Sequence, residues 1–187
     1  MTEALDLLRG RRSVAPHLLR TPGPDPAQFQ TILEIAARVP DHGKLVPWRF
    51  IVIQGNARGR FGEAAARIHA EDYPEAAEAR RRKERESVLS APLVIGPVSR
   101  AVDHPKIPHW EQVLSVGAVA MNLITAATAL GFGACWLTGW IAYDRQIAAL
   151  LALSDTEAMA GFIHLGTAVE RQADRPRPDL AQIVSTL

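Results

Sequence analysis

Residues 110–130, WEQVLSVGAVAMNLITAATAL, form the element around which this chain is predicted to fold. At about 1.5 Å per residue, a helix over Trp110–Leu130 would span about 30 Å, the width of a small domain. No Asp, Glu, Lys, Arg or His occurs between Gln112 and Tyr143, so a membrane-spanning helix has to be weighed. Asn122 and several threonines and glycines interrupt this stretch, which favours the buried central helix of a soluble protein.

The composition is that of a single globular domain over residues 1–187, with 48% hydrophobic and 22% charged residues. The 21 Lys and Arg nearly balance the 20 Asp and Glu, for a formal net charge of +1. No overall field therefore draws the chain to nucleic acid or to a membrane. Cys135 is the only cysteine, which rules out an internal disulfide and is compatible with a reducing compartment. Since no secretory signal is visible, we expect a cytoplasmic protein.

Short apolar and β-branched runs predict the strands of a sheet. These runs are Phe50–Ile53, Leu93–Val98 with an interruption at Pro97, Ala134–Trp140 and Ala160–Gly166. Five further helices are predicted: Glu3–Arg9, one that begins at Pro26 and is stopped by Pro40, Asn56–Ala70, Glu75–Ser90 and Tyr143–Leu151. Thr2 is the predicted cap of the first, and Asn56 is the predicted cap of the helix that runs to Ala70. No repeat and no domain boundary is visible, so the pattern predicts one α+β domain.

The start of the helix at Pro26 is specified in unusual detail. Asp25 is the predicted N-cap, Pro26 occupies the first helical position, and Gln28 completes a capping box. Four residues at helical spacing supply the face that this helix is expected to bury: Phe29, Ile32, Leu33 and Ala36.

Arg11, Arg12 and Ser13 follow the first short helix directly. Two guanidinium forks beside a hydroxyl make a strong anion site, suited above all to phosphate. The alternative is a set of polar residues that ends a helix, where cations are favourable. A second basic pair, Arg38 and His42, has helical i, i+4 spacing and is predicted to share a face. The first pair, Arg11 and Arg12, and this second pair are expected to converge on one ligand that carries a phosphate and a planar ring. The alternative is that Arg38 and His42 only form a solvated helix end.

Gly131 and Gly133 precede the predicted strand Ala134–Trp140. Glycine allows a backbone to approach a flat ligand closely, and backbone donors near Thr138 would face a ring nitrogen. The alternative is a helix C-cap and a tight turn. Four tryptophans lie near these turns: Trp48, Trp110, Trp136 and Trp140. They would provide either aromatic walls for a planar ligand or side chains of the core.

Three other features receive a plainer interpretation. His104, His109 and Glu111 match no standard zinc spacing, so we expect a loop and no metal. The run Arg80–Glu86 mixes charges of both signs, which favours a solvated helix face over a nucleic-acid patch. The tail, Thr167–Leu187, ends in apolar residues and is expected to pack on something, such as a partner subunit.

Six motifs in this order resemble the nitroreductase family, in particular its small NAD(P)H-dependent branch. They are Leu7-Leu-Arg-Gly-Arg-Arg-Ser13, Arg38-x-Pro-Asp-His42, Pro47-Trp48, Lys106-x-Pro-x-Trp-Glu-Gln112, Ala129-Leu-Gly-Phe-Gly133-x-x-Trp136-x-Thr-Gly139 and Gly161-Phe-Ile-His-Leu-Gly-Thr167. The resemblance covers nearly the whole chain. It implies a mixed sheet flanked by helices and an intertwined homodimer, with the long helices at the interface, a swapped C-terminal tail and FMN bound between the subunits.

The resemblance also implies which residues contact the cofactors. Those for FMN are Arg11, Arg12, Ser13, Arg38, His42, Trp136, Leu137 and Thr138. Those for NADH or NADPH are Ala126, Ala127, Thr128, Ala129, Leu130 and Gly131. The flavin carries the chemistry, so no catalytic side chain is assigned. The implied reaction passes hydride from NAD(P)H through flavin to a nitroaromatic, quinone or small aldehyde by a ping-pong mechanism; the alternative is a flavin-binding storage or sensor protein without turnover.

The chain departs from the usual pattern of the family at two places. Many members carry a lysine that contacts the flavin at the position where this chain has Ala15. Arg38 or Lys44 is therefore expected to take the place of that lysine. Many also have a Ser-Ser-x-Asn-x-Gln-Pro-Trp run, whereas this chain reads Asp41-His-Gly-Lys-Leu-Val-Pro-Trp48. A cation beside the pyrimidine edge of a flavin favours the reduced, anionic form, which is the role expected for Arg38.

Overall fold

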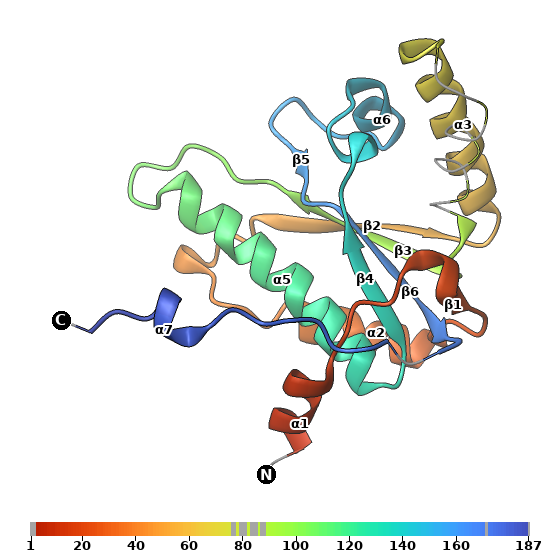
Figure 1. The fold of residues 1–187 in the computed structure, drawn as a ribbon. Coiled ribbons are helices and arrows are strands. Elements are labelled where there is room, and N and C mark those ends of the chain that lie inside the picture. Colours follow the sequence, from red (N-terminus) through yellow and green to blue (C-terminus); the bar gives the residue numbers. More distant parts are fainter. Residues whose placement is uncertain are drawn as a thin grey trace.

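The computed structural model describes residues 3–75, 78, 82, 86, 89–170 and 172–186. An antiparallel sheet lies at its centre (Figure 1). Its strands within these residues are β1 Leu19–Arg20, β2 Trp48–Gln54, β3 Leu93–Ser99, β4 Gly133–Leu137, β5 Ala158–Met159 and β6 Phe162–Ala168. The order is β1-β6-β3-β2, with β4 paired to β6 and β5 paired to β3. A parallel bridge between Ser13 and Ala134 adds the N-terminal segment beside β4.

Helices surround this sheet in an α+β arrangement, which confirms the predicted fold class. They are α1 Glu3–Gly10, α2 Pro26–Ala36, α3 Asn56–Asp72, α5 His109–Ala129, α6 Arg145–Leu150 and α7 Leu180–Ile183, with short 3-10 turns η1 Pro16–Leu18, η2 His42–Lys44 and η3 Trp140–Ala142. The predicted central helix is α5, displaced by one residue at each end.

The two faces of the sheet carry separate cores, because successive residues of a strand point to opposite faces. Leu93 and Ile95 of β3 belong to the core that contains buried residues of α2 and α5. Val94 and Val98 of the same strand belong to the core under α3 and α6. The alternation in β3 thus places two helical layers on one sheet.

Helix α5 is long and apolar enough to cross a membrane, with a mean hydropathy of 1.4. Half of that apolar window is buried inside the fold, and its residues Val119, Ala120 and Leu123 are fully buried. This burial is typical of the core helix of a soluble protein, as predicted for this stretch.

The helix α2 begins as its sequence predicts. The Asp25 side chain accepts a hydrogen bond from the Gln28 backbone N–H at 2.8 Å, and the Gln28 side chain accepts one from the Asp25 N–H at 3.0 Å. Ile32 and Ala36 are fully buried, and Phe29 packs beside them. The capping box and the buried face are both confirmed.

Two strand and cap predictions are wrong. Gly55, with φ of 55°, precedes α3, and Asn56 is its first helical residue without a side-chain cap. Strand β3 also continues through Pro97 without interruption. The Pro97 carbonyl accepts from the Ala160 N–H at 2.9 Å, so its missing donor faces the break between β5 and β6 and removes no bond to β2.

The predicted bounds of the strand Ala134–Trp140 and of the helix Tyr143–Leu151 are also wrong in detail. Strand β4 ends at Leu137, and Trp140 begins the turn η3. The helix α6 starts only at Arg145, because the Asp144 side chain caps it by accepting from the Ile147 N–H at 2.9 Å. The cap Thr2, most of the predicted helix Glu75–Ser90 and most of the run Arg80–Glu86 lie outside the described residues.

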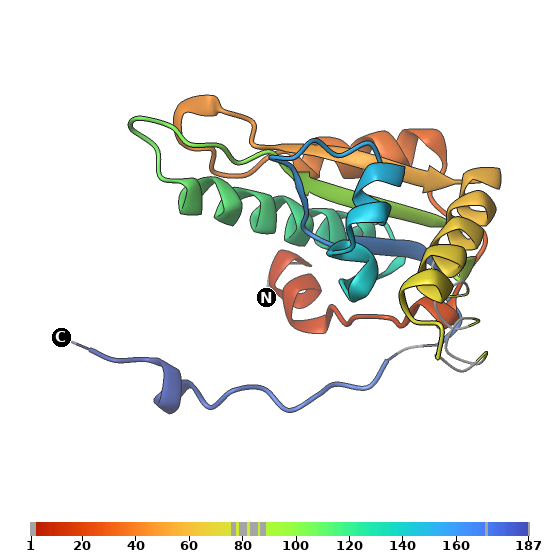
Figure 2. The ribbon, with the colours of Figure 1, turned by 90° about the horizontal axis from the view of Figure 1, so that it is seen from above.

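The tail leaves the body of the protein after β6. Figures 1 and 2 show it running away from the sheet to a terminus far from the other helices. Its short helix α7 buries none of its residues. Leu180, Ile183 and Val184 are all more than 60% exposed, so the apolar end of this tail has no cover within the described part of one chain.

Candidate functional site

The paired arginines lie where the end of α1 meets the start of β4. The Arg11 backbone N–H donates to the Leu7 carbonyl at 2.8 Å, and Ser13 bridges to Ala134. The next residue, Val14, donates its N–H to the Ala134 carbonyl at 3.0 Å. These contacts hold the Arg11 and Arg12 side chains, which are partly buried, beside the beginning of an edge strand.

The tail brings two further arginines to the same place. The Arg12 guanidinium pairs with Asp174 at 2.6 Å, and Arg177 pairs with the same carboxylate at 2.9 Å. Burial lowers the pKa of Arg11, and the positive charges of Arg177, Arg12 and Arg175 lower it further. The sequence interpretation gave Arg175 and Arg177 no role; their spacing around Pro176 was the available signal, but only the fold places them near Arg11.

A cavity of about 460 Å³ opens beside these arginines. It is lined by Arg11, Arg12, Thr128 and Gly131, and also by the carboxylate-bearing Glu170. The predicted FMN-phosphate residues and the end of the predicted nicotinamide segment therefore share one cavity. Within that segment the side chains divide by burial: Ala126 and Ala127 belong to the core, Thr128 and Leu130 are partly exposed, and Ala129 and Gly131 are exposed.

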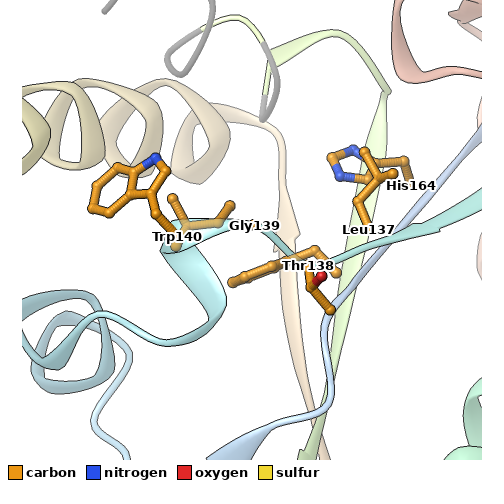
Figure 3. A pocket seen from close by; sticks show the side chains of 7 residues that line it. Leu137, Thr138, Gly139, Trp140 and His164 are labelled. Atoms are coloured by element: carbon orange, nitrogen blue, oxygen red, sulfur yellow. The ribbon is translucent and has the colours of Figure 1, made fainter. Parts of the chain in front are cut away.

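The other FMN candidates follow along β4. Trp136, Leu137 and Thr138 are exposed at its end, and the Trp136 indole N–H donates to the Ala160 carbonyl at 2.9 Å. Beyond them, Gly139 has φ of 84° and open space where a side chain would begin. A second cavity of about 330 Å³ lies here, between Leu137, Trp140 and His164 (Figure 3).

Arg38 and His42 do not share a helix face, because α2 ends at Ala36 and His42 lies in the turn η2. The Arg38 carbonyl accepts from the Asn122 side chain at 3.0 Å. The His42 Nδ1 pairs with the Glu111 carboxylate at 2.7 Å, near the start of α5.

His42 therefore lies near the N-terminal end of α5, whereas the Arg38 carbonyl contacts Asn122, well inside the helix. Thr128 comes 17 positions after Glu111, which corresponds to about 26 Å of helix. His42 therefore does not converge with Arg11 and Arg12 on one ligand within a single protomer, because those arginines share their cavity with Thr128 while His42 pairs with Glu111.

Two other polar groups have structural roles. The His104 Nδ1 accepts from the backbone N–H groups of Lys106 and Ile107 at 3.2 and 3.1 Å, which organises the loop before α5. Burial raises the pKa of the Cys135 thiol to about 12, so this cysteine stays protonated at neutral pH and is a poor nucleophile.

Comparison with known proteins gives a consistent result. The sequence profile of the nitroreductase family matches residues 8–167. The chain is 35% identical over 167 residues to YdjA of Escherichia coli K12, whose name describes an NAD(P)H nitroreductase, and covers 88% of each protein. It is 31% identical over 171 residues to an NAD(P)H nitroreductase of Haemophilus influenzae, and the alignment covers 90% of each protein.

Solved structures share the fold at lower identity. A nitroreductase-like protein from Bacillus cereus aligns with a TM-score of 0.84 at 19% identity, over 100% of this chain and 97% of that one. A nitroreductase from Desulfovibrio desulfuricans, solved in complex with FMN, aligns with a TM-score of 0.78 at 22% identity, over 100% and 98%.

Proposed function

Because the chain belongs to the nitroreductase family, we propose that it is an FMN-dependent oxidoreductase that transfers reducing equivalents from NADH or NADPH to a small acceptor. The observation that carries this proposal is the gathering of arginines at the start of β4. The acceptor classes we propose are nitroaromatics, quinones and small aldehydes.

The arginine cluster, Arg11, Arg12, Arg175 and Arg177, suits a dianionic phosphate. The lowered pKa of Arg11 reflects first its burial and then the repulsion from the other three arginines. Two carboxylates nearby, Asp174 and Glu170, offset only part of this charge. A phosphate group would relieve the repulsion, and guanidinium forks match its geometry.

The strand β4 leads from this cluster to the place proposed for the flavin ring. From Ala134, which bridges to Ser13, to Thr138 is about 13 Å of extended chain, a length that FMN covers when its ribityl phosphate and part of its ring lie along the strand. Apart from the bridge at Ser13, β4 pairs only with β6 in the described part of the sheet. The open space beside Gly139 lets the backbone approach a planar ring closely.

The remaining candidates are Arg38 and His42, of which His42 lies at the other end of α5 from the arginine cluster, too far to contact the same FMN molecule from one chain. We therefore propose that they reach the flavin from a second copy, across a homodimer interface formed by α5. Exposed apolar side chains on α5 support this arrangement: Trp110, Leu114 and Met121. The uncovered apolar end of the tail fits a swapped position on the partner.

Bound FMN would supply the hydride chemistry, accepting reducing equivalents from NAD(P)H and delivering them to the acceptor in a ping-pong cycle. The residues of this chain hold and orient the reactants. The arginine cluster anchors the phosphate, Arg38 or Lys44 places a cation near the pyrimidine edge, and Thr128–Gly131 offers an exposed helix end to the nicotinamide nucleotide. We propose a cytoplasmic location, where NADH and NADPH are available.

An absorbance spectrum of the purified protein tests this function first. We expect bound flavin, released as FMN on denaturation, that bleaches with NADH or NADPH without oxygen and recovers with nitrofurazone or menadione. A protein that binds no FMN even when FMN is supplied would refute the proposal. A flavin that stays oxidised with both nucleotides would favour the storage or sensor alternative.

A further inference from the structure

The tail brings a carboxylate, as well as two arginines, to the arginine cluster. Asp174 lies between two guanidinium groups: its Oδ2 is 2.6 Å from Arg12, and its Oδ1 is 2.9 Å from Arg177. The Arg175 backbone N–H donates to the same Oδ1 at 2.8 Å. Asp174 thus connects an arginine that follows α1 with an arginine of the tail through its two oxygens, as a phosphate between two guanidinium forks would.

The Arg12 guanidinium has few donors left for a second anion. Its Nη1 donates to the carbonyls of Arg9 and Arg11, at 2.6 and 2.8 Å. A guanidinium carries two N–H groups on each terminal nitrogen and one on Nε, so both N–H groups of Nη1 are engaged. Its Nη2 is the atom that pairs with Asp174. A phosphate held by two N–H groups of Arg12 therefore needs the nitrogen that Asp174 already contacts.

Two cavities adjoin Arg12. One, of about 460 Å³, is also lined by Arg11 and Thr128, and the other, of about 320 Å³, is lined by Asp174. An anion that enters beside Arg11 therefore meets Arg12 in its pair with the carboxylate. The Arg12 side chain is only 18% exposed and stays in place, whereas the Asp174 side chain is 56% exposed and has solvent to turn into.

Charge decides which anion Arg12 prefers. A phosphate monoester carries about −1.5 to −2 charge at pH 7 and has three acceptor oxygens, whereas Asp174 carries one negative charge. A carboxylate beside a bound phosphate is a like charge and is repelled. The phosphate therefore replaces the carboxylate on Arg12, while Arg175 and Arg177 remain beside it as cations.

We propose that Asp174 is an internal counter-ion that competes with the phosphate of FMN for Arg12. This inference rests on the proposed function and adds a control of cofactor affinity to it. Without a phosphate, Asp174 offsets the repulsion among the arginines and provides the ion pair that joins residues 172–186 to the rest of the described chain. When a phosphate binds, Arg12 exchanges one anion for the other, so the affinity for FMN is lower than the four arginines alone would give.

The variant Asp174→Asn tests the competition in the full-length apoprotein. It removes the charge but keeps an oxygen that can accept from the Arg175 N–H. Because an exposed ion pair is weak, the dissociation constant for FMN is expected to fall about threefold to fivefold, while that for riboflavin, which has no phosphate, stays unchanged. In thermal melts of the apoprotein, inorganic phosphate should raise the melting temperature more for this variant than for wild type, relative to chloride at equal ionic strength.

The matched control is Asp179→Asn, which removes the same charge from the tail. The Asp179 carboxylate accepts from the Ala181 N–H in α7, so its loss should change neither the FMN affinity nor the response to phosphate. An equal gain in this control would assign the effect to net charge and refute the inference.

The sign of the change separates competition from support. If Asp174→Asn binds FMN more weakly than wild type, Asp174 orients Arg12 for the phosphate and the inference is wrong; unchanged binding of FMN and phosphate also refutes it. In both cases the proposed function stands, because the proteins still bind FMN. If wild type and both variants bind no FMN and do not respond to phosphate, the proposed function and the inference fall together.

Discussion

The two ends of α5 differ in how complete they are within one chain. Near its C-terminal end, Thr128 and Gly131 share a cavity with Arg11 and Arg12, and the tail joins them through Asp174. Near its N-terminal end, the His42–Glu111 pair is largely exposed beside Trp110, which is 67% exposed. One protomer thus brings together the residues of the proposed phosphate half, whereas the half with His42 would be completed by a second copy in the proposed homodimer.

The largest effect is expected from a charge placed on the exposed face of α5. Leu114 is 52% exposed, so Leu114→Asp should fold as a monomer, but burying an unpaired carboxylate at a dimer interface is strongly unfavourable. We expect dissociation in sedimentation velocity and nearly complete loss of bound FMN. Leu150→Asp, at a similarly exposed position on α6, should change neither. A monomeric Leu114→Asp that keeps its FMN would show that one chain suffices.

A smaller effect is expected within the phosphate half. Hydrogen bonds to charged groups contribute about 1.5–3 kcal/mol, so Arg11→Ala should weaken FMN binding by a factor of about 10 to 150. The dissociation constants of the apoprotein for FMN and for riboflavin measure this loss. Because riboflavin lacks the phosphate, only the affinity for FMN should fall. Arg20→Ala, whose guanidinium donates to the His17 carbonyl, is the control. Equal losses for FMN and riboflavin would contradict a phosphate role for Arg11.

A modest effect is expected at the opposite end of α5. Exposed ion pairs contribute about 0–1 kcal/mol, so if the His42–Glu111 pair stays exposed in the assembled protein, Glu111→Gln should change the steady-state rate with NADH by a factor of about 5 or less. Burial of the pair by a second copy would enlarge that loss, because a buried charge would then lack its partner. Measuring kcat and KM for this variant therefore tests whether the His42 half is enclosed in the dimer.

The smallest effect on binding is expected far from both halves. The hydrogen bond from Arg49 lowers the pKa of Glu157 from 4.5 to about 2, so this carboxylate stabilises the fold above pH 4.5 and loses that effect as the pH falls toward 2. Glu157→Gln should lower the unfolding free energy at pH 7 and approach wild type as the pH falls toward 2. FMN affinity at pH 7 should stay unchanged; a large loss would show that stability and binding are not separable here.

Local sequence patterns predicted the elements whose causes are local. The capping box at Asp25 and the long apolar run of α5 were found where expected, because caps and helical periodicity depend on residues a few positions apart. Pro97 misled the prediction of β3 for the opposite reason: whether a proline breaks a strand depends on which neighbour its missing N–H would face.

What the sequence determined by itself was the family resemblance, the α+β class, the central helix and the basic residues available for an anion. Only the tertiary structure decided how those residues combine. It joined Arg175 and Arg177 to Arg11 across more than 160 positions, separated His42 from that cluster by most of the length of α5, and placed Trp140 and His164 in the lining of one cavity. The physical reason is that side-chain chemistry is a local property of the chain, whereas proximity between distant residues arises only when strands pair and helices pack.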